Sequence, residues 1–359
     1  MSNINRSRAH PFDERAGPAF PINFDVSRIL ETWMYSRFTS TFFYFCLFTL
    51  SYLSRLMPHG SRLTFFLGFV VFCIAAYLLH RALSAYDPGE IVQSIFAIPL
   101  PRLALGALFV ACSYFSLTLF DALAVRYIRA KLPYRRIALA SFTALSIGHT
   151  LGLAAASSGA IRYRFYSRWG IDAGDIAKII VFCAMTAVLG LNTLLGLALL
   201  MQADVAAKLL GFNRAVAFAF GAACLTFTAL YVGLAAVLRR PLTIKRWKIS
   251  MPPVKLALAQ IFIGALNFCF VAAALYHLLP PTAGIGYFAV AAVYAIANFA
   301  SIVSHVPGGL GVLEAVVIHL MPEASVIGAL VVFRVVYFLV PFTIGVVVFA
   351  AYELAQRRS

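Results

Sequence analysis

The chain has 359 residues, of which 62% are hydrophobic and only 12% are charged. A soluble protein has about twice that charged fraction, so the composition excludes a soluble globular protein and predicts a polytopic membrane protein. The formal net charge of +16 indicates basic cytoplasmic loops, and nucleic acid is not an expected partner.

The N-terminal region is polar and contains no early apolar core. Residues 1–37 are therefore expected to form a flexible cytoplasmic tail without a cleavable signal peptide. Residues 38–54 are uncharged but short, and a crossing there would export the arginine-bearing tail. We expect an interfacial or short membrane helix and a loop over residues 38–62, followed by a transmembrane domain over residues 63–355.

Apolar runs long enough to cross a hydrocarbon layer of about 30 Å recur along the rest of the chain. They predict an all-α fold, a polytopic bundle of membrane helices with about six full spans. The six runs cover residues 63–81, 103–124, 176–201, 215–237, 255–279 and 325–352.

Loop charge indicates how these runs cross the membrane. The loops after the second and fourth runs, at 126–136 and 239–248, are rich in arginine and lysine and are expected in the cytoplasm, as are both termini. A consistent path then requires that residues 138–170 enter the membrane from the cytoplasm and return to it. Residues 286–321 must likewise enter and return from the periplasm. The sequence therefore predicts two re-entrant or broken hairpins, an arrangement characteristic of transporters with inverted repeats.

The first hairpin combines small residues with fixed positive charge. Ser158 and Gly159 suit a break whose free N–H groups hold an anion, and Arg162 follows directly. Because arginine matches the geometry of phosphate, one interpretation is a lipid-headgroup site. The alternative is helix-packing small residues followed by ordinary cytoplasmic arginines, and we favour that alternative for Arg164 and Arg168.

The second hairpin contains the most unusual stretch of the chain. Residues 304–314 place a proline, three glycines and a carboxylate inside an apolar region. A continuous membrane helix is not built this way, because glycine and proline lower helix propensity and a buried charge is costly in hydrocarbon. We interpret the stretch as a re-entrant element that faces an interior site. The alternative is an extramembrane turn between two short helices.

Two carboxylates lie inside apolar segments. Asp121 is near the cytoplasmic end of its run and is expected to pair with Arg126 or Arg129. Glu314 lies deeper, and it is expected to pair with Arg334 or Arg162, because an unpaired charge at that depth costs several kcal/mol.

The pair formed by Glu314 is either purely structural or part of a coupling mechanism. Pro341 is expected to kink the last helix. His149 and His305 either line one interior cavity or are satisfied polar residues of their helices, and we favour the second interpretation.

Several classes of site have no support in the sequence. The six cysteines lie within apolar runs without a CxxC pair, and the histidines show no metal-binding spacing, so neither a metal nor a cofactor is expected. No phosphate-binding loop of the form GxxxxGK[ST] and no GxSxG nucleophile motif is present.

Three motifs together resemble a known membrane family. Residues 306–314, Val-Pro-Gly-Gly-Leu-Gly-Val-Leu-Glu, look like a PGGxGxxE element. Arg334, Tyr337 and Pro341 match an RxxYxxxP final helix, and residues 158–166 look like a Gly-x-x-Arg hairpin. Over roughly residues 60–355 the chain resembles the transmembrane region of the lysylphosphatidylglycerol synthase/flippase family, the MprF-like proteins and their stand-alone YbhN-like relatives.

The resemblance implies a lipid translocase of the bacterial inner membrane that moves aminoacylated phosphatidylglycerol between leaflets. Full-length members of that family also carry a C-terminal aminoacyltransferase domain, and because this chain ends at Ser359 we expect no enzyme activity. Two other functions fit the sequence: a membrane partner of a separately encoded lipid or glycan transferase, and a proton-coupled small-molecule transporter that uses Glu314.

The expected partners are phospholipid and the membrane itself, with a separate transferase and a second copy of the chain as further possibilities. The candidate lipid-binding residues are His149, Ser158, Gly159, Arg162, Tyr163, Pro307, Gly308, Gly309, Gly311, Glu314, Arg334 and Tyr337.

Overall fold

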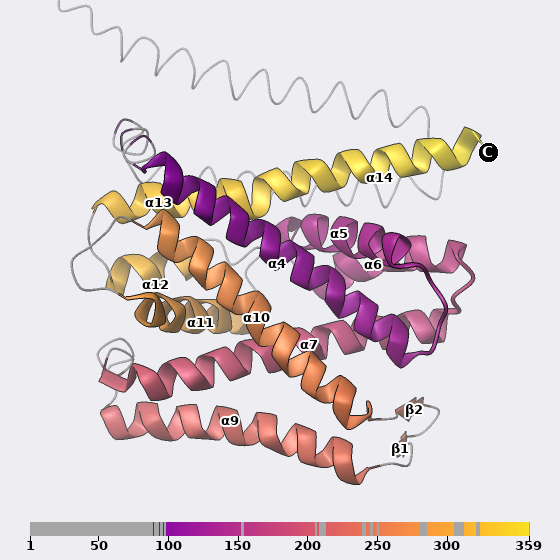
Figure 1. Ribbon diagram of the computed structural model, residues 1–359, viewed down its shortest axis with the longest axis horizontal. Coiled ribbons are helices and arrows are strands. Elements are labelled where there is room, and N and C mark those ends of the chain that lie inside the picture. Colours follow the sequence, from indigo (N-terminus) through magenta and orange to yellow (C-terminus); the bar gives the residue numbers. More distant parts are fainter. Residues whose placement is uncertain are drawn as a thin grey trace, which may run out of the picture. The chain divides into compact units, whose positions relative to one another are not determined.

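The computed structural model is shown in Figure 1. It describes residues 98–151, 154–204, 213–238, 242–244, 247–249, 251–279, 286–304, 312–320 and 324–358, together with the single positions 89, 93, 96 and 207. These residues all belong to one compact unit, Leu63–Ser359. The predicted tail, the segment 38–62 and the first predicted span lie outside the described residues.

Long apolar helices form the centre of the bundle. Helices α4 (Leu100–Tyr127) and α10 (Val254–Leu278) lie side by side in extensive contact, and α7 (Ala173–Met201) packs against both. Helix α9 (Arg214–Val237) lies along α7 and has the least buried of these surfaces. Each of these helices is apolar around its whole circumference, so every face must be covered by protein or by lipid.

Five helical stretches within the described ranges are long and apolar enough to cross a membrane. Four of them are the helices just named, and the fifth is Gly328–Gln356 near the C-terminus. These five confirm the predicted spans that the structure describes, and they confirm a polytopic helix bundle.

Polar residues and prolines fix where these helices begin. The Asp172 carboxylate accepts hydrogen bonds from the backbone N–H groups of Gly174 and Asp175 at 2.7 and 3.1 Å and so caps α7. These bonds, led by that from Asp175, lower the pKa of the Asp172 carboxyl below its usual value. Asn213 caps α9 in the same way, and Pro253 directly precedes α10.

Glycine allows the closest helix contacts. A Cβ atom added to Gly190 in α7 would overlap the backbone of Gly264 in α10, and one added to Gly264 would overlap the Thr186 carbonyl and the backbone of Gly190. Glycines permit such backbone contact in membrane bundles, where association depends on close packing.

Both predicted hairpins are pairs of packed helices. Helix α5 (Tyr134–Leu151) packs against α6 (Ala154–Arg168), and α11 (Tyr287–Ser304) packs against α12 (Val312–Leu320). None of these four helices is among the candidate spans. That the hairpins enter the membrane and return remains a prediction, since no bilayer is part of the structure.

The C-terminal span is a continuous helical run in three parts. Helix α13 (Ala324–Arg334) passes into a π-helical turn, η2 (Val335–Leu339), and then into α14 (Val340–Arg358). The π-helical turn ends immediately before Val340 and Pro341, and the kink predicted at Pro341 stays a prediction.

A small β-hairpin lies in the basic connection between α9 and α10, and it was not predicted. Strands β1 (Leu242–Ile244) and β2 (Trp247–Ile249) pair in antiparallel register, with Thr243 opposite Lys248. The rest of the described chain is helical or irregular, so the predicted all-α class holds for the bundle itself.

The basic segments gather at one end of the bundle, on the right in Figure 1. The ring of Tyr127 at the end of α4 stacks on Phe182 near the start of α7, with centroids 5.2 Å apart. The Arg136 guanidinium near the start of α5 lies over the ring of Trp169, which directly follows α6. Glu353 near the end of α14 pairs with arginines of α6. This common end is what the loop-charge argument requires, while the side of the membrane that it faces remains a prediction.

Candidate functional site

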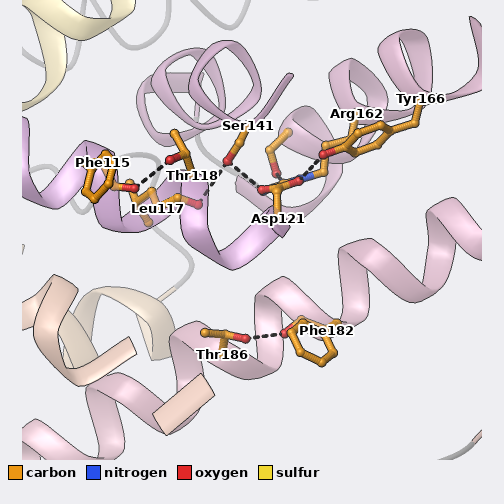
Figure 2. Close-up of polar contacts among 10 residues, drawn as sticks. Phe115, Leu117, Thr118, Asp121, Ser141, Arg162, Tyr166, Phe182 and Thr186 are labelled. Atoms are coloured by element: carbon orange, nitrogen blue, oxygen red, sulfur yellow. Dashed lines mark hydrogen bonds and ion pairs between the residues drawn. The ribbon is translucent and has the colours of Figure 1, made fainter. Parts of the chain in front are cut away.

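The most enclosed charges in the described structure form one ion pair. Asp121 lies on α4 and Arg162 lies on α6, and their side chains are 0% and 3% exposed. The Arg162 Nε and Nη2 atoms donate to the two carboxylate oxygens at 2.8 and 2.7 Å, as Figure 2 shows. This two-point geometry is the strongest form of an arginine–carboxylate contact.

Polar side chains from the two helices of the first hairpin complete this cluster. Ser141 on α5 donates to Asp121 at 2.6 Å, and the Tyr166 hydroxyl on α6 donates to it at 2.9 Å. The Arg162 Nη1 atom donates to the Ser158 hydroxyl at 3.0 Å. Each oxygen of the Asp121 carboxylate therefore accepts two hydrogen bonds, and the cluster ties α4 to both helices of the first hairpin.

The predicted partners of Asp121 were wrong. Asp121 is fully buried, whereas Arg126 and Arg129 are exposed at the end of α4 and beyond it. Five residues advance a helix by about 1.4 turns, so the side chain of Arg126 leaves α4 on a different face. The partner of Asp121 is Arg162, which is distant in sequence and reaches it only because the hairpin folds back against α4.

The predicted break at Ser158 and Gly159 was also wrong. Both residues lie inside α6, which begins at Ala154, because the alanines before Ser158 are strong helix formers. The Ser158 hydroxyl binds Arg162, and a Cβ atom at Gly159 would approach Ile180 of α7 to 3.2 Å. These residues therefore hold α6 in place, and the contact of Arg162 with a headgroup phosphate remains a prediction.

A second ion pair joins α12 to the end of α13. The Arg334 Nε and Nη2 atoms donate to the two carboxylate oxygens of Glu314 at 2.7 and 3.0 Å. The guanidinium also lies 4.8 Å from the centre of the Phe338 ring, a favourable cation–π distance. The Arg334 and Glu314 side chains are 7% and 20% exposed. The predicted pairing of Glu314 with Arg334 is confirmed, and Arg162 is not its partner.

Aromatic side chains surround the π-helical turn that follows Arg334. The ring of Tyr337 stacks on Phe333 at 5.3 Å, and it lies 5.7 Å from Tyr114 of α4 and 6.4 Å from His149 of α5. The Tyr114 hydroxyl donates to the Tyr337 carbonyl at 3.1 Å. Two of the predicted site residues, His149 and Tyr337, are thus brought together next to the second ion pair.

One buried ring nitrogen of His149 lies in this aromatic cluster. Its Nδ1 atom is buried and has no hydrogen-bond partner among the residues that the structure describes. A buried polar atom without a partner is costly, so such an atom in an interior site is suited to a ligand or an ordered water. The favoured interpretation of His149 as a satisfied helix residue does not hold for this nitrogen.

The remaining predicted site residues do not join this cluster. Tyr163 is 52% exposed on the outer surface of α6, away from the interior pairs. Arg164 and Arg168 lie at the exposed end of α6, where both bind Glu353. Five predicted residues of the second hairpin lie outside the described residues: His305, Pro307, Gly308, Gly309 and Gly311.

Sequence reasoning missed several buried polar contacts between spans. Ser113 of α4 donates to Asn267 of α10 at 2.8 Å. Gln260 of α10 accepts from the Tyr231 hydroxyl of α9 at 2.7 Å and donates to Thr186 of α7 at 3.0 Å. The available signal was the presence of amide side chains within apolar runs, since such residues are expensive in hydrocarbon unless they find partners.

The clusters offer anion-binding arginines and hydrogen-bonding groups, and they do not resemble a metal centre. Within the described ranges, no group of three or more His, Cys, Asp or Glu side chains is placed to hold a metal ion. Each of the two arginines binds a carboxylate through two nitrogen atoms.

Comparisons with known proteins identify the family. The chain is 31% identical over 296 residues to the uncharacterized protein slr0712 of Synechocystis, and the match covers 81% of this chain and 92% of that protein. It is 30% identical over 255 residues to the inner membrane protein YbhN of Escherichia coli, and this match covers 69% of this chain and 79% of YbhN. No family model matches the chain. The resemblance to stand-alone YbhN-like proteins is thereby confirmed, and the chain belongs to the YbhN family of membrane proteins.

Proposed function

We propose that the protein is a lipid translocase of the bacterial inner membrane. It binds an anionic or aminoacylated phospholipid, such as lysyl-phosphatidylglycerol, and moves it between leaflets. The observation that carries the proposal is the ion pair of Glu314 and Arg334 beside a π-helical turn in the last span. Ionisable residues inside membrane helices are rare and characteristically mark substrate or ion pathways.

The two ion pairs differ in how readily they can exchange partners. Asp121 and Arg162 are almost completely enclosed, and the carboxylate oxygens of Asp121 already accept four hydrogen bonds. Glu314 is 20% exposed, so a ligand reaches this pair more easily. We therefore assign the headgroup phosphate to Arg334, and we assign the pair of Asp121 and Arg162 to holding the first hairpin.

The neighbouring aromatic cluster provides the second part of headgroup recognition. The unpartnered Nδ1 atom of His149 can accept a hydrogen bond from a headgroup hydroxyl or ammonium group, and the rings of Tyr114 and Tyr337 lie beside it. Aromatic faces also attract cations, so an aminoacylated headgroup would find favourable contacts here. The acyl chains would remain in contact with the exposed apolar residues of the bundle surface.

The proposal is tested by measuring lipid movement directly. Purified protein is reconstituted into vesicles that contain fluorescent phosphatidylglycerol, and dithionite reports the fraction of lipid that reaches the outer leaflet. Wild-type protein should accelerate this movement over protein-free vesicles, and Glu314→Gln should slow it about tenfold or more, since Arg334 loses its charged partner. Asp175→Asn is the matched control, because it removes an exposed ion pair with Lys178 at the start of α7 and should leave the rate near that of wild type.

Two results would reject the translocase. One is an unchanged rate of lipid movement for folded wild-type protein at every lipid composition tried, including lysyl-phosphatidylglycerol. The other is an equal loss in Glu314→Gln and Asp175→Asn, which would reduce the effect to general destabilisation. In the same vesicles, supplying charged tRNA should yield no aminoacylated lipid, because we propose a transporter without aminoacyltransferase activity.

A further inference from the structure

The last span is divided between the two hairpins. Its first part, α13, packs against α12 and α10 and carries the arginine that binds Glu314. Its second part, α14, packs against α5, where a Cβ atom at Gly345 would overlap the Ser146 side chain. Further along, Glu353 binds Arg164 and Arg168 of α6. One half of the span therefore belongs to the second hairpin and the other half to the first.

The junction between these halves departs from α-helical geometry. In η2 the backbone N–H group of Val340 donates to the carbonyl of Val335, five residues earlier. Pro341 has no N–H group, so it cannot donate to the Tyr337 carbonyl four residues earlier. The Tyr114 hydroxyl of α4 donates to that carbonyl at 3.1 Å. π-helical turns and prolines are the places where helices bend.

We infer that η2 is a hinge that couples the two hairpins and that the Tyr114 hydroxyl is the latch that holds it in the observed arrangement. A shift of α12, driven by exchange at the Glu314 carboxylate, would turn α13 and be passed across η2 to α14 and the first hairpin. The inference rests on the proposed function and extends it, because it names the element that moves during lipid transfer. It assigns to Tyr114 a positioning role, since this residue acts through the backbone of the hinge.

The packing on either side explains why motion concentrates at η2. Glycine contact and a two-arginine clamp fix α14 to the first hairpin, and a bidentate ion pair fixes α13 to α12. A rigid connection on both sides leaves the irregular turn as the compliant part. A single buried hydroxyl–carbonyl bond changes a two-state population by roughly threefold to tenfold, which is enough to hold a hinge without locking it.

The test is a measurement of the distance between α14 and the second hairpin. Spin labels are placed at Val347→Cys on α14 and Phe288→Cys on α11, two exposed positions, in protein that lacks its native cysteines and is held in phosphatidylglycerol nanodiscs. Pulsed electron resonance then reports the distribution of distances. Tyr114→Phe should raise a second, minor distance population roughly threefold to tenfold relative to wild type.

Tyr287→Phe is the matched control. The Tyr287 hydroxyl makes the same type of bond, 3.0 Å to the Cys269 carbonyl in regular helix α10, so its loss should leave the distances unchanged. Pro341→Ala restores a backbone donor for the Tyr337 carbonyl and should reduce the minor population.

Two results would overturn the hinge. The first is an identical distance distribution in Tyr114→Phe and Tyr287→Phe. If Tyr114→Phe does not yield folded protein, Pro341→Ala decides, and a distribution as broad as that of wild type rejects the hinge. The measurement needs no lipid movement. The distance measurement can therefore reject the hinge while lipid movement supports the translocase. It can equally support the hinge in a protein that moves no lipid.

Discussion

Gly190 of α7 and Gly264 of α10 meet backbone to backbone, so that a methyl group on either would overlap the opposite helix. Gly264→Ala should therefore force the helices apart and lower the free energy of unfolding by about 1–3 kcal/mol. The expected readout is a lower midpoint of thermal unfolding in detergent. Gly233→Ala is the control, because a Cβ atom at that exposed position of α9 meets nothing within 4 Å. An equal loss in both variants would contradict the close contact.

The pair of Asp121 and Arg162 should behave as a buried structural pair. Asp121→Asn leaves the buried guanidinium of Arg162 without its charge partner and should lower the free energy of unfolding by about 3–5 kcal/mol. The double variant Asp121→Leu, Arg162→Met should lose less than the sum of its single changes. Arg164→Ala, which removes an exposed pair, should cost about 0–1 kcal/mol. Chemical unfolding curves measure these variants together with the single changes Asp121→Leu and Arg162→Met, and strict additivity would argue against direct coupling.

Glu314 and Arg334 should instead couple in transport. Glu314→Gln and Arg334→Gln are each expected to slow lipid movement, and the double variant should be impaired by less than the product of the two effects, because residues in direct contact share one interaction. The measurement is the rate of fluorescent phosphatidylglycerol exchange in vesicles. Independent, multiplicative effects would show that the pair does not act as a unit.

Opposite accessibility is predicted for the two hairpins. Ala173→Cys lies just after the first hairpin and should react with a membrane-impermeant thiol reagent only from the cytoplasm. Gly286→Cys lies just before α11, where a side chain meets nothing within 4 Å, and should react only from the periplasm. Native cysteines are removed from both proteins. Labelling of position 173 from outside the cell would refute the predicted topology.

The sequence predicted the spans and one ion pair for clear physical reasons. Long apolar runs leave little choice but membrane helices, and Glu314 needed a charged partner at similar depth, which Arg334 provides. The partner of Asp121 was missed because it depends on how α6 folds back onto α4, and no local spacing encodes that. Pro341 predicted a kink, whereas the π-helical turn before it was not predicted, and the Tyr337 carbonyl in that turn accepts from Tyr114 of α4, a distant part of the sequence.

Gln260 imposes an order on the assembly of this bundle. Its amide joins Tyr231 of α9 and Thr186 of α7, both of which are synthesised before α10. Until α10 enters the membrane, the Tyr231 hydroxyl lacks this acceptor, while Thr186 can bond to the Phe182 carbonyl of its own helix. The docking of α10 thus supplies the missing acceptor for the Tyr231 hydroxyl. In a chain interrupted before α10 that hydroxyl would need another partner, because an unsatisfied polar group is costly in hydrocarbon.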